Sequence, residues 1–568
     1  MKNKYIVVTL LALTVLAACK KEFLVTPPIG AAALPDLTTP SGLNTLIVSA
    51  YKMVTAHNNN GSSYGSAADE WVWGSVAADD AYKGSEINDQ PPINDIETWV
   101  VKADNGFLND RWSSLFDGIT RANLVLKTLP LVNGLSDSVK TEITAEMRFL
   151  RGHYYFTARK IFNKYVPYID ETSPNYFVDN TQEIWPKIEA DFAFAAAHLP
   201  VSQGKEVGKA TKYAAIAYLG KTYLYEKQYD KAKAQFDQVV SSGLYSLSNC
   251  FHDNFDAATK NGPESIFAAQ NSVNDGSGGS NGNQGDVLNF TYGPSAPVSC
   301  CGFFQPSQNL VNAFLVDAST GLPYNTSSIT DSYAQGLVND LGLPSTAPFT
   351  PDPRPVDPRL DWTVGRRGIP FLDWGIEPGS SWVRNQSAGG PYAQLKTMYK
   401  LSEKGTFSEA SNNNASAINV NIIRYADVLL MDAECEVELG NLEVARRYVN
   451  QIRARAAKPA CQVVTSSGTP AANYKASLYS TTWTDALAAR AAVQRERRIE
   501  LGMEGHRFFD LVRWGIASQV LNDYAKSEYK IPETGSGNAK FTDQHIYWPV
   551  PQTQIDQSKG ILKQAPGL

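Results

Sequence analysis

The chain has 568 residues, enough to bury a large core and to form two or three domains. Its 51 Lys and Arg residues are outnumbered by 57 Asp and Glu residues, which gives a net charge of -6. This balance argues against a nucleic-acid partner, because binding to a polyanion depends on clustered positive charge. Aromatic residues make up 11% of the chain and supply rings for a core or for ligand stacking.

The first 18 residues are predicted to be an export signal. Two lysines precede a short apolar run that starts at Tyr5 and ends in Ala17 and Ala18. The run is too short to span a bilayer, and Cys19 follows it at the position where bacterial lipoproteins are acylated. We therefore expect residues 19–40 to be a tether attached to membrane lipid through Cys19, with an ordinary signal peptide as the alternative.

Beyond Cys19 the chain has five more cysteines, none with the spacing of a zinc site. An odd number leaves at least one thiol unpaired, so we expect no disulfide framework. Cys300 and Cys301 could bridge to each other or to Cys250, but simple burial is the favoured interpretation. The sequence indicates no metal and no other cofactor.

Residues 41–270 are predicted to be largely helical. In IAYLGKTYLYEKQYDKAKAQFDQVVSSGLY the successive positions of a tetratricopeptide repeat are filled by Leu219, Gly220, Tyr223, Tyr229, Ala232 and Phe236. Small residues let two antiparallel helices approach closely, and the rings fill the space beside them. Further helix pairs are expected over residues 107–129 and 138–162. One repeat cannot bury its own apolar face, so several should stack.

A weaker repeat lies in the C-terminal part, residues 421–568. ADVLLMDAECEVELGNLEVARRYVNQIRARA has Ala433, Gly440, Leu442 and Ala445 at matching offsets, but Glu436 where a ring is expected. The fold class is therefore mainly α.

Between the two helical parts, residues 271–420 are rich in Gly, Pro, Ser and Asn and are predicted to form long loops. Such loops are usually functional or disordered, and the tryptophans among them favour function. The stretch from Asn274 to Asp286 has oxygen ligands for Ca²⁺ but lacks the acid spacing of an EF-hand, so a solvated loop is the favoured interpretation.

The stretch EGHRFFDLVRWG, from Glu504 to Gly515, looks at first like a metal or catalytic centre. His506 and Asp510 are four residues apart, which on a helix places them on one face. However, no other histidine has a paired spacing, and Gly505 weakens any helix that would hold His506 in register with Glu500. We interpret the stretch as structural, with Arg and Glu side chains forming ion pairs.

No hydrolase, zinc-protease or phosphate-loop motif is present. A glycosidase needs only two carboxylates at a set separation, and Asp79, Asp80 and Glu70 are the acids that such an enzyme would use here.

Taken in order, several segments resemble the SusD/RagB family of nutrient-binding outer-membrane lipoproteins of Bacteroidetes. They are LAACKKEFLVTPP, WSSLFDGITRANLVL, AEMRFLRGHYYFTARKIF, FFQPSQNLVNAFLVD, IIRYADVLLMDAECEVELGN, RRIELGMEGHRFFDLVRWG and YWPVPQTQI. The resemblance covers nearly the whole chain. It implies a helical, tetratricopeptide-containing body with a loop-built ligand surface, and it makes EGHRFFDLVRWG a packing signature.

The resemblance also implies a function without catalysis. Such a protein is anchored in the outer membrane and faces the cell exterior. It binds an oligosaccharide and acts as the lid of a SusC-like, TonB-dependent β-barrel transporter. Two alternatives remain: a surface glycosidase, and a tetratricopeptide scaffold that binds peptides or proteins.

Ligand binding is expected to use aromatic rings that stack on sugar faces, with polar groups taking the hydroxyls. The candidates, by position or because they lie in the loops, are Trp71, Trp73, Tyr82, Asn88, Trp99, Trp362, Trp374 and Trp382. The remaining tryptophans, in helical or signature contexts, are expected in the core; they are Trp112, Trp185, Trp483, Trp514 and Trp548.

Overall fold

The computed structural model describes residues 34–56, 63–324, 336–410, 414–527 and 539–568. The predicted signal peptide, Cys19 and most of the predicted tether lie outside the described residues. Within these ranges no helix is both long enough and apolar enough to cross a membrane.

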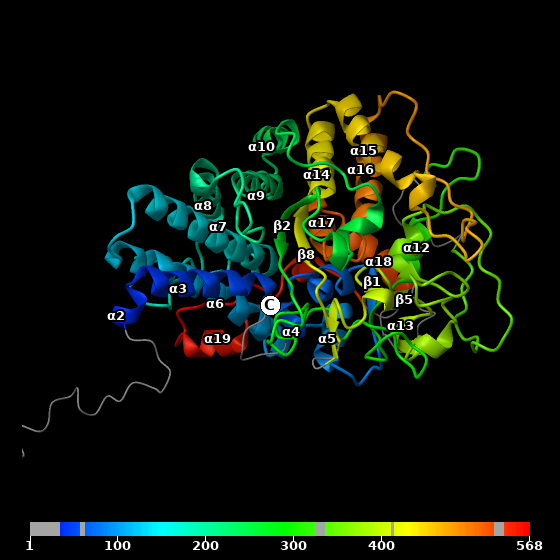
Figure 1. Cartoon of the computed structure of the whole chain (residues 1–568), viewed down its shortest axis with the longest axis horizontal. Helices are drawn as coiled ribbons and strands as arrows, with labels where there is room; N and C mark the ends of the chain where they lie inside the picture. Colours follow the sequence, from blue (N-terminus) through cyan, green and yellow to red (C-terminus); the bar gives the residue numbers. More distant parts are fainter. Residues whose placement is uncertain (1–33, 57–62, 325–335, 411–413, 528–538) are drawn as a thin grey trace, which may run out of the picture.

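The described part is mainly helical, as predicted (Figure 1). The α-helices are α2 Leu34–Leu37, α3 Pro40–Lys52, α4 Ser63–Ser66, α5 Pro91–Glu97, α6 Gly106–Thr128, α7 Asp137–Phe162, α8 Trp185–His198, α9 Lys212–Tyr225, α10 Tyr229–Ser241, α11 Gln308–Ala313, α12 Leu360–Thr363, α13 Gln386–Gly389, α14 Tyr425–Glu438, α15 Leu442–Ala456, α16 Ala486–Leu501, α17 Arg507–Trp514, α18 Ala517–Ser527 and α19 Gln552–Gln557. A π-helix, η3, spans Trp71–Val76.

Several of the long helices begin at a polar cap. The side chains of Asn105, Ser136, Thr211 and Asp485 each accept a hydrogen bond from a backbone N–H in the first turn of α6, α7, α9 and α16. Each cap satisfies a donor that a helix start leaves unpaired, which typically contributes about 1 kcal/mol.

The predicted tetratricopeptide pair is α9 and α10. A Cβ added at Gly220 would lie 2.7 Å from the Phe236 ring, so only glycine allows this approach, and Ala232 is fully buried. The weaker repeat is α14 and α15. Its Glu436, in place of a ring, is buried and lies 3.2 Å from Lys233 on α10. An ion pair thus replaces aromatic packing between the two repeats.

The strands are short and pair in antiparallel twos: β1 Ala81–Gly84 with β3 Phe303–Pro306, β2 Ser265–Ala269 with β8 Val420–Arg424, β4 Val364–Gly365 with β5 Ala393–Gln394, and β6 Ser408–Glu409 with β7 Ala415–Ser416. The β2–β8 ladder joins the two ends of the loop-rich region, so residues 270–419 leave the helical body and return to it at one place. The β1–β3 ladder attaches that region to the segment that follows η3.

The loop-rich region has a hydrophobic cluster of its own. Phe290, Phe371, Trp382, Leu395 and Tyr399 are buried together, apart from the main core. Burial of these side chains offsets the entropy lost when loops without regular structure become ordered.

The cysteine prediction was wrong. Cys250 is bonded to Cys461, and Cys300 is bonded to Cys301, while Cys435 is a buried free thiol. The expectation of at least one unpaired thiol was correct, because Cys435 is free. The sequence separations of the cysteines do not reveal that Cys250 lies next to Cys461, which follows the end of α15. The Cys250–Cys461 bond encloses a loop of 211 residues and so constrains the unfolded chain.

Candidate functional site

EGHRFFDLVRWG forms ion pairs in the core, as the sequence analysis predicts. Glu504 lies 2.7 Å from Lys396 and 2.8 Å from Arg424. Asp510 lies 2.6 Å from Arg497. Burial alone would raise the pKa of Asp510, but Arg497 outweighs it and the pKa is lowered. Both carboxylates are therefore charged and engaged, with no coordination left for a metal.

The same stretch packs directly on η3. Gly505 has a φ of +74° and donates a hydrogen bond to Ser75 Oγ at 3.2 Å. A Cβ at Gly505 would lie 2.1 Å from the Asp69 carbonyl oxygen, and one at Gly74 would lie 1.8 Å from the Gly505 carbonyl oxygen. The two segments touch backbone to backbone, which only glycine permits.

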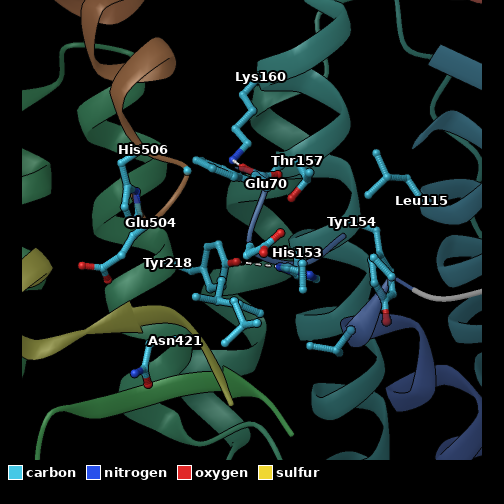
Figure 2. A pocket seen from close by; sticks show the side chains of 18 of the residues that line it. Glu70, Leu115, His153, Tyr154, Thr157, Lys160, Tyr218, Asn421, Glu504 and His506 are labelled. Atoms are coloured by element: carbon cyan, nitrogen blue, oxygen red, sulfur yellow. Dashed lines mark hydrogen bonds and ion pairs between the residues drawn. The ribbon is translucent and has the colours of Figure 1, made fainter. Parts of the chain in front are cut away.

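A small cavity of about 50 Å³ lies beside this junction (Figure 2). Its walls include His153, which lies 2.6 Å from Tyr218 Oη, and His506. Burial lowers the pKa of His506 to about 4 and that of His153 to about 3, so both imidazoles are neutral at pH 7. A space of this size admits water but not a sugar ring. The cavity is part of the core and not a ligand site.

The acids proposed for a glycosidase are buried in ion pairs. Asp79 lies 2.7 Å from Arg507 and 3.0 Å from Arg498, while Asp80 lies 3.2 Å from Arg498. Glu70 contacts Arg111 and Lys160. Burial raises the pKa of Asp79, but Arg498 and Arg507 bring it down to about 2. Each of these carboxylates is therefore buried and paired with a basic side chain.

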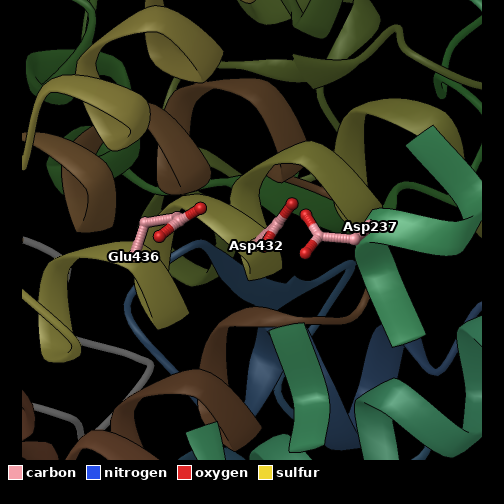
Figure 3. A group of neighbouring side chains, drawn as sticks. All are labelled: Asp237, Asp432 and Glu436. Atoms are coloured by element: carbon pink, nitrogen blue, oxygen red, sulfur yellow. The ribbon is translucent and has the colours of Figure 1, made fainter. Parts of the chain in front are cut away.

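One group of acids in the described residues is close enough to share an ion. Asp237 on α10 faces Asp432 and Glu436 on α14, with ligand atoms within 4.8 Å of one another (Figure 3). The Lys233 ammonium already lies 2.6 Å from Asp237 and 3.2 Å from Glu436. Burial, with Asp237 and Glu436 nearby, raises the pKa of Asp432 to about 8, so this acid holds its proton at pH 7. The Lys233 ammonium thus already neutralises part of the negative charge of this cluster.

Four candidate rings lie in the core. Trp71, Trp73, Tyr82 and Trp99 are each less than 2% exposed. The indole N–H of Trp73 donates to Gly65 O at 2.7 Å, and that of Trp99 donates to Ala77 O at 2.9 Å. The expectation that these rings contact ligand is therefore corrected: Trp71 and Trp73 lie on η3, which packs against α17, Tyr82 lies on β1, Trp99 follows α5, and all four are buried in the core.

The three loop tryptophans are also engaged within the protein. Trp362 stacks on His252 at 4.6 Å, and Trp374 donates to Tyr399 O at 2.8 Å. Both remain half-buried. Trp382 is buried at the centre of the loop cluster, which leaves no free face for a sugar.

The most exposed ring in this region is Tyr292. Its side chain is 39% exposed, and the other aromatic side chains among the described residues of 271–420 are buried or half-buried. The Arg384 guanidinium carbon lies 5.0 Å from the ring centre, and the Tyr292 N–H donates to Trp382 O at 3.0 Å. The Trp382 carbonyl thus holds the backbone of Tyr292, and the Arg384 guanidinium lies over its ring.

Polar groups from a third segment complete this surface. Arg384 Nη1 donates to Ser85 Oγ at 2.8 Å and to Asp89 Oδ2 at 2.7 Å. Asn88, one of the candidates, lies exposed in the same loop after β1. We call Tyr292, Arg384, Asp89 and Asn88 the Tyr292 surface. Asn88 is the one exposed residue among the eight candidates, and it is the one that belongs to this surface.

The bonded pair Cys300–Cys301 lies in the loop that supports this surface. Gly302 follows it with a φ of +77°, and its carbonyl accepts a hydrogen bond from the Ser85 N–H at 2.5 Å. A Cβ at Gly302 would lie 3.1 Å from Arg384 Cβ and 3.5 Å from Tyr292 Cβ. The three segments of the surface therefore meet at Gly302.

Sequence reasoning missed Tyr292, Arg384 and Asp89. Tyr292 precedes Gly293 and Pro294, which places it in a turn, where a ring is more exposed than in a helix or strand. The sequence therefore contained a local signal for the exposure of Tyr292. It contained no local signal for the contact between Asp89 and Arg384, which are 295 residues apart.

Comparison with known proteins gives matches over both halves of the chain. The sequence model of the SusD family matches residues 263–567, and a model described as "starch-binding associating with outer membrane" matches residues 35–224. SusD-like protein P25 of Formosa agariphila is 22% identical over 469 residues, which cover 80% of this chain and 78% of that protein. SusD-like protein P2 of the same organism is 24% identical over 504 residues, or 83% of this chain and 88% of that protein.

Solved structures share the fold. A laminarin-binding SusD-like protein is 22% identical, with a TM-score of 0.66 over 93% of this chain and 100% of its own. Surface glycan-binding protein A of Bacteroides thetaiotaomicron, in complex with laminarihexaose, is 18% identical, with a TM-score of 0.65 over 93% of this chain and 99% of its own.

Proposed function

Since the chain belongs to the SusD family, we propose that it is a lipid-anchored outer-membrane protein that binds oligosaccharides at the cell surface. In this proposal it is the lid of a SusC-like, TonB-dependent β-barrel transporter and passes its ligand inward. Structural neighbours with laminarin and laminarihexaose in their names support the ligand class. The family model named for outer-membrane association supports the location.

The observation that carries the proposal is the Tyr292 surface. One face of Tyr292 is covered by Arg384, and the exposed part of the ring offers an apolar plane to the C–H groups of a sugar. Asp89 and Arg384 beside it have side chains 31% and 21% exposed, and they supply an acceptor and donors for sugar hydroxyls. Because the surface is open, we expect weak binding and fast release.

Weak binding suits a tethered lid. Two proteins held in one assembly present a released ligand to the transporter at an effective concentration in the millimolar range. Rapid dissociation from the Tyr292 surface then aids transfer, and tight binding would slow it.

The first test is binding. An array of neutral oligosaccharides that includes laminarihexaose should identify ligands, and calorimetry should then compare Tyr292→Ala and Arg384→Ala with the wild type. We expect each substitution to weaken binding by roughly tenfold, through loss of the stacking ring or of its orientation. Tyr176→Ala removes a ring that is 67% exposed elsewhere and is the matched control. Equal affinity in all four proteins would refute the role of this surface.

Two further measurements separate the alternatives. Reducing-end release from a panel of polysaccharides would favour the surface glycosidase; we expect none, because Asp79, Asp80 and Glu70 are locked in ion pairs. Purification from membranes in mild detergent should recover a large β-barrel protein with the chain. Its absence, together with bound peptides, would favour the tetratricopeptide scaffold.

The lipid anchor is tested by Cys19→Ala. Removal of the acylation point should move the protein, once separated from its transporter, from the membrane fraction to the soluble fraction, because the acyl chains that would hold it in the lipid are then missing. Cys435→Ala, which removes a buried thiol, is the control and should leave the protein in membranes. Continued membrane association of isolated Cys19→Ala protein would contradict the anchor.

A further inference from the structure

A second cleft, with a volume of about 710 Å³, lies between residues 317–324 and the segment from Tyr479 to Arg495. We call it the α16 cleft, because the first half of α16 lines one side. It does not include any residue of the Tyr292 surface. Its volume is within the range of small-molecule sites in proteins, about 300 to 1,000 Å³.

Side chains of α15 hold both walls of this cleft. Arg453 is fully buried; its Nε donates to Ser477 O at 2.5 Å and its Nη2 donates to Gly321 O at 3.1 Å. The Ser477 N–H also donates to Gly321 O, at 3.0 Å. Gly321 has a φ of +66°, and a Cβ there would lie 2.4 Å from Ser477 Oγ. The two walls are therefore held together by hydrogen bonds where Gly321 meets Ser477.

The wall that carries the aromatic rings is fixed in the same way. Asn450 on α15 accepts from the Tyr479 N–H at 2.8 Å and donates to Tyr479 O at 3.0 Å. Glu443, two turns earlier on α15, accepts from the Trp483 N–H at 2.6 Å. These contacts hold the backbone beneath both rings, so the rings are positioned before any ligand arrives, which lowers the entropy cost of binding.

The inner surface combines flat rings with hydroxyl groups. Tyr479 and Trp483 pack edge to face with centres 5.2 Å apart, and Tyr324 faces the cleft from the other wall. All three are half-buried, although Trp483 is predicted from the sequence to be a core residue. The hydroxyl groups come from Thr481, Thr482 and Thr484, which are exposed.

The charged side chains that line the cleft are Asp317, Asp485 and Arg495. Asp317 accepts hydrogen bonds from Ser319 and Thr320, and Asp485 caps α16. The α16 side of the cleft is formed largely by alanine methyl groups, which leave room for a flat ligand to lie against the helix. Rings, hydroxyls and methyl groups without a concentration of charge suit a neutral, polyhydroxylated ligand.

We propose that the α16 cleft is a second carbohydrate site, which binds a neutral oligosaccharide segment with Trp483 as its main stacking ring. The inference rests on the proposed function for its ligand class but not for its location. Two separate sites on one chain would let it hold a long glycan at two points and so raise the overall avidity.

The test compares the sites one at a time on the full mature chain. Calorimetry uses laminarihexaose and each neutral oligosaccharide that the array shows to be bound. The variants are Trp483→Ala, Thr482→Val and Arg384→Ala. Leu487→Ala is the matched control, because Leu487 is 74% exposed on α16 but does not line the cleft. Thermal unfolding checks that each variant is folded, and Thr482→Val keeps the test valid if the tryptophan variant unfolds.

We expect two binding events in the wild type and the loss of one of them, or a weakening of roughly tenfold, in Trp483→Ala. Thr482→Val should weaken the same event, and Leu487→Ala should change neither. Unchanged binding in both cleft variants would overturn this inference and leave the proposed function intact. Loss of all binding in Arg384→Ala would also overturn it. A wild-type protein that binds no oligosaccharide on the array would overturn both proposals.

Discussion

Glu500→Gln should destabilise the protein by about 3 kcal/mol. Glu500 is fully buried on α16, and its carboxylate lies 2.8 Å from Arg359 and 2.6 Å from Arg424 and contacts Arg455. Removal of one partner from a buried ion pair costs about 3 to 5 kcal/mol. Each arginine keeps another carboxylate, as Arg359 keeps Asp357 at 2.8 Å, so the lower end of that range applies.

The assay is thermal unfolding by calorimetry. An unfolding entropy of about 2.1 cal/mol/K per residue gives about 1.2 kcal/mol/K for 568 residues, so a loss of 3 kcal/mol lowers Tm by roughly 3 °C. Glu206→Gln is the matched control, because Glu206 has a side chain 66% exposed beside Lys209. Its loss should stay below about 0.5 kcal/mol.

The effect of Glu500→Gln should also depend on pH. Burial would raise the pKa of Glu500, but Arg455, Arg424 and Arg359 hold it well below its usual range. A lowered pKa in the folded state stabilises the protein above the unfolded pKa, about 4.3, and this contribution is lost as the pH falls. A Glu500→Gln protein that unfolds at the same temperature as the Glu206→Gln control at pH 7 would refute the expected loss of stability.

Two further substitutions, each with a control, test the buried acid Asp286 in the loop-rich region and the glycine Gly505 in EGHRFFDLVRWG. Burial raises the pKa of Asp286 to about 6, and this buried acid faces Asp69, so its contribution to stability is full below about pH 4 and is lost as the pH rises through 6. In thermal unfolding, the stability of Asp286→Asn relative to the wild type should therefore rise between pH 4 and pH 7. Asp275→Asn is the control: hydrogen bonds from Ser272, Ser277 and Asn281 lower the pKa of this exposed acid, so it is largely ionised in both the folded and the unfolded state over this range and its difference from the wild type should change little with pH. An Asp286→Asn difference that is also independent of pH would contradict the prediction. Gly505→Ala should cost about 3 kcal/mol or more, because its Cβ would lie 2.1 Å from Asp69 O. Gly515→Ala has the same φ of +74° with no atom within 4 Å and should cost about 1 kcal/mol, so equal losses would exclude a steric cause.

The helical body was predictable from the sequence because its signals are local. The spacing of Gly220, Ala232 and Phe236 specifies two helices in close contact, and the structure has them in contact. The structural interpretation of EGHRFFDLVRWG also came from a local signal, the glycine that interrupts its helix.

The proposed ligand surface was not predictable in the same way. Exposure of a ring depends on what packs against it from distant parts of the chain. Trp382 and Tyr292 lie in loops of similar composition, yet Trp382 is 6% exposed and Tyr292 is 39% exposed. Composition gives the number of aromatic residues but does not show which of them are buried in the loop cluster and which lie on the surface. The bond between Cys250 and Cys461 was not predicted for the same reason, because it also depends on contacts between distant parts of the chain.

The burial of Trp382 explains how the loop-rich region can carry a binding surface at all. A long excursion with little regular structure must bury apolar area to become ordered, and its tryptophans supply that area. Trp382 O then accepts a hydrogen bond from the Tyr292 N–H. The backbone of the buried Trp382 thus holds the backbone of the exposed Tyr292 in place. Arg384, two residues after Trp382, is held by Asp89 from the segment after β1. The ring, its cation and their acceptor are thus positioned by a core that no ligand touches, and side chains on the surface can change to suit another sugar without loss of the loop fold.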